Sequence, residues 1–357
     1  MKKALIAMSG GVDSSVAAYL AKQSGFDCVG MMMKLYANDD IVGVQNMRTC
    51  CSLEDAADAR AVAHKLDMPF YVADFTADFK TEVMDRFIAA YQNGETPNPC
   101  IDCNRYMKFE KLYFRARQLG LDYVVTGHYA KIEFDEQSKR WLLKKSVDES
   151  KDQSYVLYSM TQEQLAHTLF PLGGMTKSEA REIAEAQGFI NANKRDSQDI
   201  CFVPDGNYAK FIEEYAKQTF PPGNFVDLQG RILGSHKGII RYTIGQRKGL
   251  GLAFPQPMYV CGVNVKDNTV TLCKESELFT KSLEAKDFNW IAFEQPSESI
   301  RVKAKIRYKH VEQWATTEVN SDGTIRIEFD EPQRAITPGQ AVVLYDEDIV
   351  VGGGTIA

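Results

Sequence analysis

No apolar run in the 357-residue sequence approaches the length of a membrane-spanning helix. The first residues, MKKALIAMSGG, place two lysines before apolar residues as a signal peptide does, but a glycine turn ends the apolar run directly after Met8. The chain also lacks internal repeats and low-complexity tracts. We therefore expect a cytoplasmic protein, whose length allows two or three domains.

An excess of positive charge is missing too, because the formal net charge is −6. This balance argues against nonspecific binding of nucleic acid by the whole surface, although it leaves room for a local basic face. The apolar content of 44% and the charged content of 25% are those of an ordinary soluble protein.

A permanent disulfide framework is not expected for the eight cysteines in a reducing cytosol. Three of them lie in apolar runs and are expected to be buried and inert: Cys28, Cys261 and Cys273. Cys50 and Cys51 are adjacent before an expected helix, where metal ligation is an alternative. The remaining three lie in polar, loop-like segments: Cys100, Cys103 and Cys201.

Strand-like and helix-like patterns alternate in the first half of the chain. Apolar runs predict strands at residues 3–8, 27–36, 69–75 and 122–130. Helical periodicity predicts helices at 14–25, 52–67, 78–94, 108–120 and 175–188. Thr176 and Glu179 have the spacing of a capping box at the start of the last of these helices. Such alternation is typical of an α/β fold with a parallel sheet covered by helices on both faces.

The pattern changes from about Met258 onward, where short strands with turn signals dominate. The predicted strands lie at 258–263, 269–273, 287–293, 300–310, 324–329 and 340–353. They indicate an all-β module, which we expect to be a small barrel.

The stretch SGGVDSS, residues 9–15, joins the first expected strand to the first expected helix. Gly10 and Gly11 permit a tight turn, and Ser14 and Ser15 lie where free N–H groups of a helix favour an anion. In an open parallel sheet this turn lies at the carboxyl edge, where ligands bind. A tight turn with a good cap is the alternative. No G-K-[ST] follows and no G-x-G-x-x-G is present, so the loop is neither of the two commoner nucleotide motifs.

The stretch RVKAKIRYK, residues 301–309, alternates basic with apolar residues. At the two-residue period of a strand, five basic residues share one face: Arg301, Lys303, Lys305, Arg307 and Lys309. No acidic residue separates them, so we favour a phosphate-contacting face over a merely solvated one. A second stretch without acidic residues carries four more basic side chains: Lys237, Arg241, Arg247 and Lys248.

Cys100 and Cys103 lie in TPNPCIDCN, residues 96–104, whose Pro, Asn and Asp residues predict a loop. Two thiols in such a loop can chelate a metal, cycle as a redox pair, or serve as nucleophile and helper. The spacing alone does not choose among these roles.

The loop SGGVDSS resembles the PP-loop of ATP pyrophosphatases, which cleave ATP between its α and β phosphates and leave AMP on a substrate oxygen. Longer strings extend the resemblance over nearly the whole chain, to the tRNA-specific 2-thiouridylase (MnmA) family. They occur in this order: SGGVDSSVAAYL, TPNPCIDCNRYMKF, VVTGHYA, KDQSYVLY, DSQDICF, TIGQRKGLG, KIRYKH and TPGQAVVLY. The family uses ATP to replace the C2 oxygen of uridine 34, the wobble base of certain tRNAs, with sulfur.

The resemblance implies a PP-loop domain at residues 1–205, a small central tRNA-contacting domain at 206–275 and a C-terminal β-barrel at 276–357. It also implies ATP and Mg²⁺ as cofactors, with Asp13 acting through the metal. The residues that would contact ATP are Ala7, Met8, Ser9, Gly10, Gly11, Val12, Asp13, Ser14, Met33 and Gly127.

The resemblance further implies that Cys201 carries the incoming sulfur as a persulfide and that Cys103 is the partner nucleophile. The target base would face Asn98, Pro99 and Cys100. Seven further residues would touch the tRNA: His128, Lys151, Asp152, Gln153, Arg307, Tyr308 and Gln340. A sulfur-donor protein or sulfide would be a second partner.

Position 100 departs from the family's best-known form, which has aspartate there. Under a persulfide interpretation Cys100 is a bystander. Under a cluster interpretation Cys100, Cys103 and Cys201 hold a [4Fe–4S] cluster whose open iron binds hydrosulfide, and three thiols with a vacant site favour this alternative. An amidating PP-loop ligase or a noncatalytic tRNA-binding protein remain as other classes, but the first does not need the cysteines and the second does not need the PP-loop.

Overall fold

The computed structural model describes residues 1–36, 53–194 and 200–357. Cys50 and Cys51 lie outside these described residues, so the alternative of a metal site there is not addressed. None of the helices within the described ranges is long and apolar enough to cross a membrane.

A parallel sheet forms the centre of the first part of the chain, as the alternating pattern predicted. Its strand order is β3-β2-β1-β4-β7, and every neighbouring pair is parallel. The strands are β1 (Lys3–Ala7), β2 (Asp27–Lys34), β3 (Phe70–Asp74), β4 (Tyr123–Val125) and β7 (Thr168–Leu169). The chain runs outward from β1 through β2 to β3 and then returns to place β4 on the other side of β1. The carboxyl ends of β1 and β4 therefore border the crevice at which open α/β sheets bind ligands.

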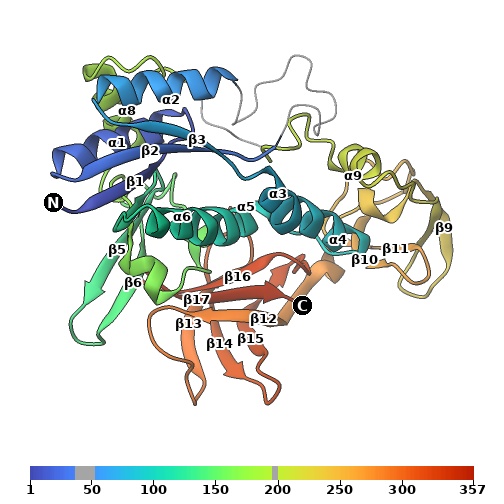
Figure 1. The fold of residues 1–357 in the computed structure, drawn as a ribbon. Helices are drawn as coiled ribbons and strands as arrows, with labels where there is room; N and C mark the ends of the chain where they lie inside the picture. Colours follow the sequence, from blue (N-terminus) through green and yellow to red (C-terminus); the bar gives the residue numbers. More distant parts are fainter. Residues whose placement is uncertain (37–52, 195–199) are drawn as a thin grey trace.

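Helices cover both faces of this sheet (Figure 1). Ala4 and Ile6 of β1 are buried in the core on one face, and Leu5 is buried in the core on the other. The first face carries α1 (Val12–Gln23), α2 (Leu53–Lys65) and α8 (Lys177–Ala186). The second face carries α3 (Thr76–Phe79), η2 (Lys80–Asp85), α4 (Arg86–Gln92), α5 (Pro99–Asp102), η3 (Cys103–Lys111) and α6 (Leu112–Gln118). Two short helices, η4 (Ser154–Leu157) and α7 (Gln162–Ala166), precede β7.

A small module follows, at the right of Figure 1. Its sheet has the order β10-β11-β8-β9, and only the β11–β8 pair is parallel. The elements are α9 (Tyr208–Ala216), β8 (Gly223–Val226), β9 (Ile232–His236), η5 (Ile239–Arg241), β10 (Tyr259–Asn264) and β11 (Thr269–Cys273). The sequence pattern predicted β10 and β11 but missed β8 and β9, whose glycine and polar residues weaken the apolar alternation.

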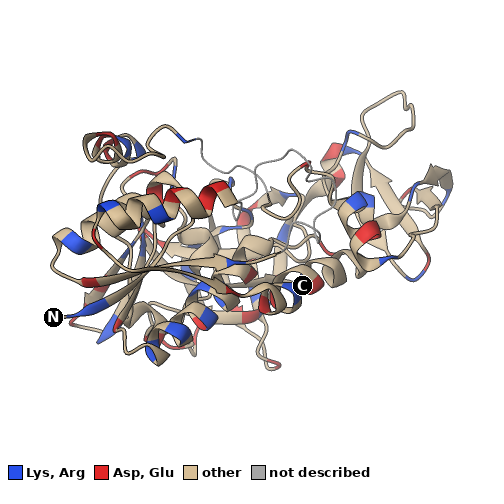
Figure 2. Ribbon diagram, turned by 45° about the horizontal axis from the view of Figure 1, so that its top comes forward, with Lys and Arg blue, Asp and Glu red and all other residues tan. Residues whose placement is uncertain are grey.

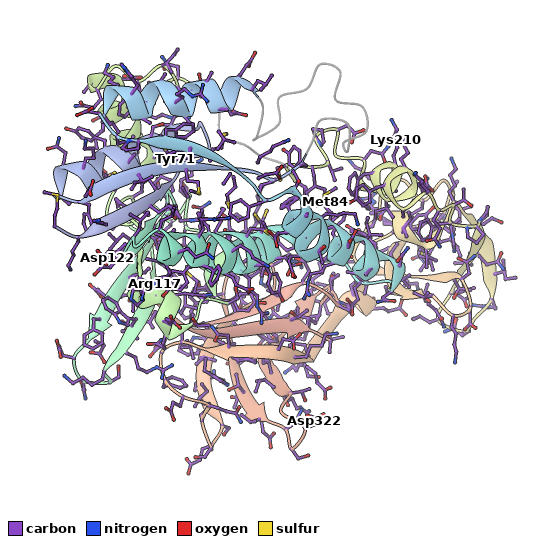
Figure 3. The ribbon with its side chains drawn as sticks, viewed as in Figure 1. Tyr71, Met84, Arg117, Asp122, Lys210 and Asp322 are labelled. Carbon is purple, nitrogen blue, oxygen red and sulfur yellow. The ribbon has the colours of Figure 1, made fainter. Side chains whose placement is uncertain are left out.

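The last part of the chain is a closed antiparallel barrel, which confirms the expectation. After η6 (Glu275–Leu278), the barrel strands are β12 (Phe279–Trp290), β13 (Ile300–Lys305), β14 (Gln313–Val319), β15 (Ile325–Arg334), β16 (Ala341–Asp346) and β17 (Ile349–Ile356). The order β12-β15-β14-β13-β16-β17 closes because β12 also pairs with β17. A hairpin from the first half, β5 (Ala130–Asp135) and β6 (Arg140–Lys145), extends the same sheet through a β17–β6 pairing. Figure 3 marks the three regions with Asp122 before β4, Lys210 on α9 and Asp322 in the β14–β15 turn.

An aromatic cluster joins the α/β part to the small module. Phe202 is 1% exposed and lies with its ring centroid 5.7 Å from that of Phe79, 5.3 Å from that of Phe87 and 5.2 Å from that of Phe211 on α9. The two parts thus share one apolar core. Because Phe202 directly follows Cys201, the same cluster holds the backbone that carries this thiol.

Replacement of Phe202 by alanine should lower the free energy of unfolding by about 3–5 kcal/mol, because it leaves a cavity among three rings. Urea unfolding followed by fluorescence measures this loss. Phe114, which is 61% exposed on α6, supplies the matched control, and Phe114→Ala should change stability by no more than about 0.5 kcal/mol. Equal effects of the two substitutions would contradict this account of the core.

Candidate functional site

The turn between β1 and α1 has a backbone that only glycine can provide. Gly10 has φ of +76°, and a Cβ atom there would lie 2.3 Å from the carbonyl oxygen of Asp55. The N-cap residue of α1 is Gly11, which offers no side-chain cap. By contrast, α7 and α8 both begin with capping boxes, and that of α8 is the predicted Thr176–Glu179 pair. The first N–H groups of α1 therefore remain available to an anion.

Two side chains from the segment after α8, Asn191 and Lys194, form hydrogen bonds with this turn. Asn191 donates to the carbonyl oxygen of Gly10 and to Ser15 Oγ, both at 2.9 Å. Lys194 Nζ lies 2.6 Å from Asp55 Oδ1, 2.7 Å from Asp58 Oδ2 and 3.2 Å from the carbonyl oxygen of Gly10. Burial alone would lower the pKa of Lys194, but the hydrogen bonds to the two aspartates outweigh it and raise the pKa. The sequence pattern did not reveal either residue, because both follow α8 in the chain and reach the turn only in the folded protein.

Asp13, the predicted metal-linked residue, lies in the first turn of α1. Both of its carboxylate oxygens accept hydrogen bonds from Lys177 Nζ, at 2.7 and 2.8 Å, and Oδ1 also accepts one from the Tyr129 hydroxyl at 2.8 Å. A carboxylate beside uncapped N–H groups is a suitable ligand for the Mg²⁺ that accompanies ATP phosphates. The residues present thus fit a nucleotide with its metal, and Lys177 is a participant that the sequence did not indicate.

The predicted ATP residues come together at one edge of the sheet. Ala7 ends β1 and Met8 follows it, Met33 lies near the end of the neighbouring β2, and Gly127 follows β4 on the other side. A Cβ atom on Gly127 would lie 2.6 Å from the carbonyl carbon of Asp13 and 2.8 Å from the backbone nitrogen of Ser14. The backbone after β4 therefore packs directly on the start of α1.

The segment with Cys100 and Cys103 is helical, so the prediction of a loop was wrong. Asn98 is the N-cap of α5, its side chain accepts a hydrogen bond from the Cys100 N–H, and Pro99 occupies the first turn. Cys103 begins η3, a π-helical segment of nine residues. The Asn-Pro pair that suggested a loop is in fact a helix-start signal.

The three polar cysteines differ in exposure. Cys100 is exposed, whereas Cys103 and Cys201 are half-buried and pack against the same apolar core. The carbonyl oxygen of Cys201 accepts a hydrogen bond from the Tyr36 hydroxyl at 3.1 Å. Within residues 1–36, 53–194 and 200–357, no group of three or more His, Cys, Asp or Glu side chains is arranged to hold a metal. An iron–sulfur cluster on Cys100, Cys103 and Cys201 stays a prediction, and no step below passes through one.

Two residues of the barrel that are predicted to contact tRNA, Tyr308 and Gln340, bind backbone segments of the first half of the chain. The Tyr308 hydroxyl donates to the carbonyl oxygen of Asp152 at 3.0 Å, and Gln340 Nε2 donates to the carbonyl oxygen of Thr96 at 2.6 Å. Burial is the main cause that raises the pKa of Tyr308, and the charges of Asp152 and Cys100 add to the effect. Lys151 is half-buried in the turn directly before Asp152.

The remaining predicted tRNA residues are more enclosed. Arg307 donates to the carbonyl oxygen of Arg334 at 2.6 Å, and Gln153 Oε1 accepts from the Tyr129 N–H at 2.9 Å. His128 is 6% exposed, and its Nε2 lies 3.2 Å from Lys108 Nζ. Because an ammonium only donates, Nε2 must accept, and burial together with Lys108 holds the pKa of His128 well below its usual value. A tRNA contact of His128 stays a prediction that would require this packing to open.

The basic strand is shorter and less uniformly charged than predicted. β13 ends at Lys305, so Arg307 and Lys309 lie beyond it, and Asp330 of β15 forms an ion pair with Arg301. Lys303 lies 5.4 Å from the ring centre of Trp314. Figure 2 shows that, over the ribbon as a whole, basic residues are interspersed with acidic ones. The sequence could not reveal Asp330, because the barrel brings it beside β13 from a strand further along the chain.

Family models match the chain in three successive ranges. They are described as "tRNA methyl transferase HUP domain" at residues 2–205, "tRNA methyl transferase PRC-barrel domain" at 209–274 and "Aminomethyltransferase beta-barrel domain" at 280–356. A "tRNA-specific 2-thiouridylase MnmA" from Clostridioides difficile (strain 630) is 55% identical over 99% of this chain and 98% of its own. A protein of the same name from Lachnoclostridium phytofermentans is 52% identical over 100% of this chain and 99% of its own. A solved NMN synthetase from Francisella tularensis, at 16% identity and a TM-score of 0.34 over 61% of this chain and 78% of its own, is too distant to bear on the argument.

Gly127→Ala should weaken the binding of a nonhydrolysable ATP analogue by about a hundredfold, because the new methyl group displaces the backbone at Asp13 and Ser14. Isothermal titration calorimetry measures the affinity. Gly174→Ala is the matched control, since no atom lies within 4 Å of the Cβ that it would add. Unchanged affinity in the Gly127 variant would contradict the proposed packing of the site.

Asp102, next to Cys103, gives a pH-dependent prediction. Burial raises the pKa of Asp102 to about 6, despite the opposing effects of Arg86 and Arg105. A carboxyl whose pKa is raised by folding stabilises the protein below its unfolded pKa near 4 and loses that contribution as the pH rises through 6. Asp102→Asn should therefore match the unsubstituted protein near pH 4 and be more stable by about 2 kcal/mol above pH 7. Urea unfolding across this range is the measurement, and parallel pH profiles would refute the assignment.

Proposed function

The chain belongs to the tRNA-specific 2-thiouridylase (MnmA) family, and from this premise we propose that it uses ATP to replace the C2 oxygen of uridine 34 of tRNA with sulfur. The observation that carries the proposal is the uncapped glycine turn at the carboxyl edge, with Asp13 beside it. Two half-buried cysteines on one apolar core supply groups suited to sulfur chemistry.

The first step activates the base. The C2 oxygen attacks the α phosphorus of ATP, and the bond from that phosphorus to the bridging oxygen of pyrophosphate breaks. The N–H groups at the start of α1 donate hydrogen bonds to the departing pyrophosphate and stabilise its negative charge. Magnesium, held by Asp13, would supply further charge neutralisation. The uridine must leave its stack to expose C2, and an anticodon loop makes this cheaper than a duplex does.

The second step transfers sulfur from a cysteine persulfide. The terminal sulfur of a Cys201 persulfide attacks C2, and AMP departs with the original C2 oxygen. The Cys103 thiolate then attacks the Cys201 sulfur. The electrons of the broken S–S bond stay with the sulfur on C2, which gives 2-thiouridine and a Cys103–Cys201 disulfide. With a protein persulfide as donor, a thiol reductant first reduces the disulfide, and the Cys201 thiolate then takes the terminal sulfur of the donor, whose own thiol leaves. With sulfide as donor, hydrosulfide attacks the Cys201 sulfur of the disulfide, which gives the Cys201 persulfide and releases the Cys103 thiol without a further reductant.

The tRNA would lie against the place where the barrel meets α5, the helix that contains Cys100. Cys100 is exposed at the start of α5, directly after Asn98 and Pro99. The target base would approach this helix start while neighbouring nucleotides contact the segment that contains Lys151 and Asp152. The proposed interface therefore involves both halves of the chain.

The proposal is tested by incubating the protein with ATP, Mg²⁺, a sulfur donor and an unmodified tRNA. Pyrophosphate, AMP and 2-thiouridine at position 34 should form in equal amounts. Cys201→Ser and Cys103→Ser should each reduce thiolation by at least about a thousandfold, as the loss of an essential nucleophile does. Cys261→Ser in the small module is the control and should retain activity.

Cys100 separates the two sulfur-transfer mechanisms. Under the persulfide mechanism, Cys100→Ser remains active in aerobically purified, iron-free protein. Under the alternative [4Fe–4S] mechanism, anaerobic reconstitution loads about four irons per chain and Cys100→Ser loses both iron and thiolation. Absence of pyrophosphate release with any tRNA would refute the proposed function itself.

A further inference from the structure

Lys177 is an enclosed cation that binds the carboxylate of Asp13. Its side chain is 11% exposed, and its ammonium lies 2.7 and 2.8 Å from the two oxygens of Asp13. The Asp13 side chain is 33% exposed, so this carboxylate is open on one side and covered by Lys177 on the other. The pair is buried enough for its charges to matter and open enough for an incoming ligand to reach it.

The backbone of Lys177 is firmly held while its side chain spans the gap to α1. Lys177 is the first residue of α8, and its N–H donates to Asp148 Oδ2 at 3.0 Å. Thr176 and Glu179 close the capping box around the same turn. The helix start is thus fixed by its own bonds, and the four-carbon side chain is the part that can change direction.

Lys177 and a metal ion cannot both occupy the same oxygens of Asp13. A divalent cation needs a carboxylate oxygen at contact distance, where it would repel an ammonium bound to that oxygen. A nucleotide brings its phosphate oxygens to the adjacent N–H groups of α1, one turn or less from Asp13. Those oxygens would be new acceptors for an ammonium that the metal ion displaces from Asp13.

We infer that Lys177 is a further nucleotide-binding residue, which neutralises Asp13 before the nucleotide arrives and transfers its hydrogen bonds to phosphate oxygens when Mg²⁺ takes Asp13. This inference rests on the proposed function and deepens it. In the adenylation step, the ammonium of Lys177 would then neutralise part of the negative charge that develops on the departing pyrophosphate. Lys194 is different, because two aspartates and a carbonyl oxygen hold it behind the turn.

The test measures binding of α,β-methylene-ATP to the full chain, with Mg²⁺ and with a chelator. Without metal, Lys177→Met should weaken binding by roughly ten- to hundredfold, because the Asp13 carboxylate is then left without its neutralising cation beside the phosphates. The Mg²⁺ concentration that half-saturates analogue binding should nevertheless fall several-fold, because the ammonium no longer competes for Asp13. Lys177→Arg should retain most of the metal-free affinity. Lys22→Met, at the far end of α1, is the control and should match the unsubstituted protein.

The opposite shifts in analogue affinity and Mg²⁺ requirement distinguish this role from simple support of the fold. Unchanged binding in Lys177→Met, or a loss of affinity with no fall in the Mg²⁺ requirement, would overturn the inference while leaving the proposed function intact. Failure of the unsubstituted protein to bind the analogue would instead overturn the ATP site. If Lys177→Met does not fold, the Lys177→Arg variant decides the question. A hundredfold loss of metal-free affinity in Lys177→Arg, with the Mg²⁺ requirement of the unsubstituted protein, would contradict a role based on charge.

Discussion

The close approach of backbone segments around the start of α1 is the constraint on which the candidate site depends. Gly10 leaves no room for a Cβ atom against Asp55, and Gly127 leaves none against Asp13. These contacts draw together the ends of β1 and β4 and the start of α2, and thereby bring the predicted ATP residues to one edge. A larger side chain at either glycine would separate the segments, and the uncapped N–H groups of α1 would lose the surroundings that make them a site.

Charge balance is the second feature of the same place. Helix α1 exposes partial positive charge at its start, while Asp13, Asp55 and Asp58 place carboxylates around it, each bound by a lysine that the sequence pattern did not indicate. Lys194 stabilises the turn from behind, and Lys177 reaches the side that a nucleotide would approach. Removing one member of a buried ion pair leaves an uncompensated charge, so these lysines connect the stability of the turn with its chemistry.

The sequence was sufficient for the class of fold and for the position of the glycine turn, because both follow from local patterns along one segment. Alternating apolar runs predicted the parallel sheet. The change of pattern near Met258 predicted a barrel, although the first two of its predicted strands, β10 and β11, belong to the small module and the barrel begins at β12. Features that depend on distant segments were not predictable in this way. Lys177 and Lys194 reach the turn across the fold, Asp330 pairs with Arg301 across the barrel, and the β5–β6 hairpin joins a sheet formed mostly by the end of the chain. The helix at Cys100 was misjudged for a different reason, since Asn98 and Pro99 favour a helix start as much as a loop.

The central claim is that the C2 oxygen of uridine 34 becomes an adenylate before sulfur replaces it, and isotope transfer tests this directly. A tRNA carrying ¹⁸O at C2 of that uridine is incubated with the protein, ATP and a sulfur donor, and the AMP is examined by mass spectrometry. The account predicts one ¹⁸O atom in each AMP that accompanies a 2-thiouridine. Formation of 2-thiouridine with unlabelled AMP, or with ADP as the nucleotide product, would contradict it.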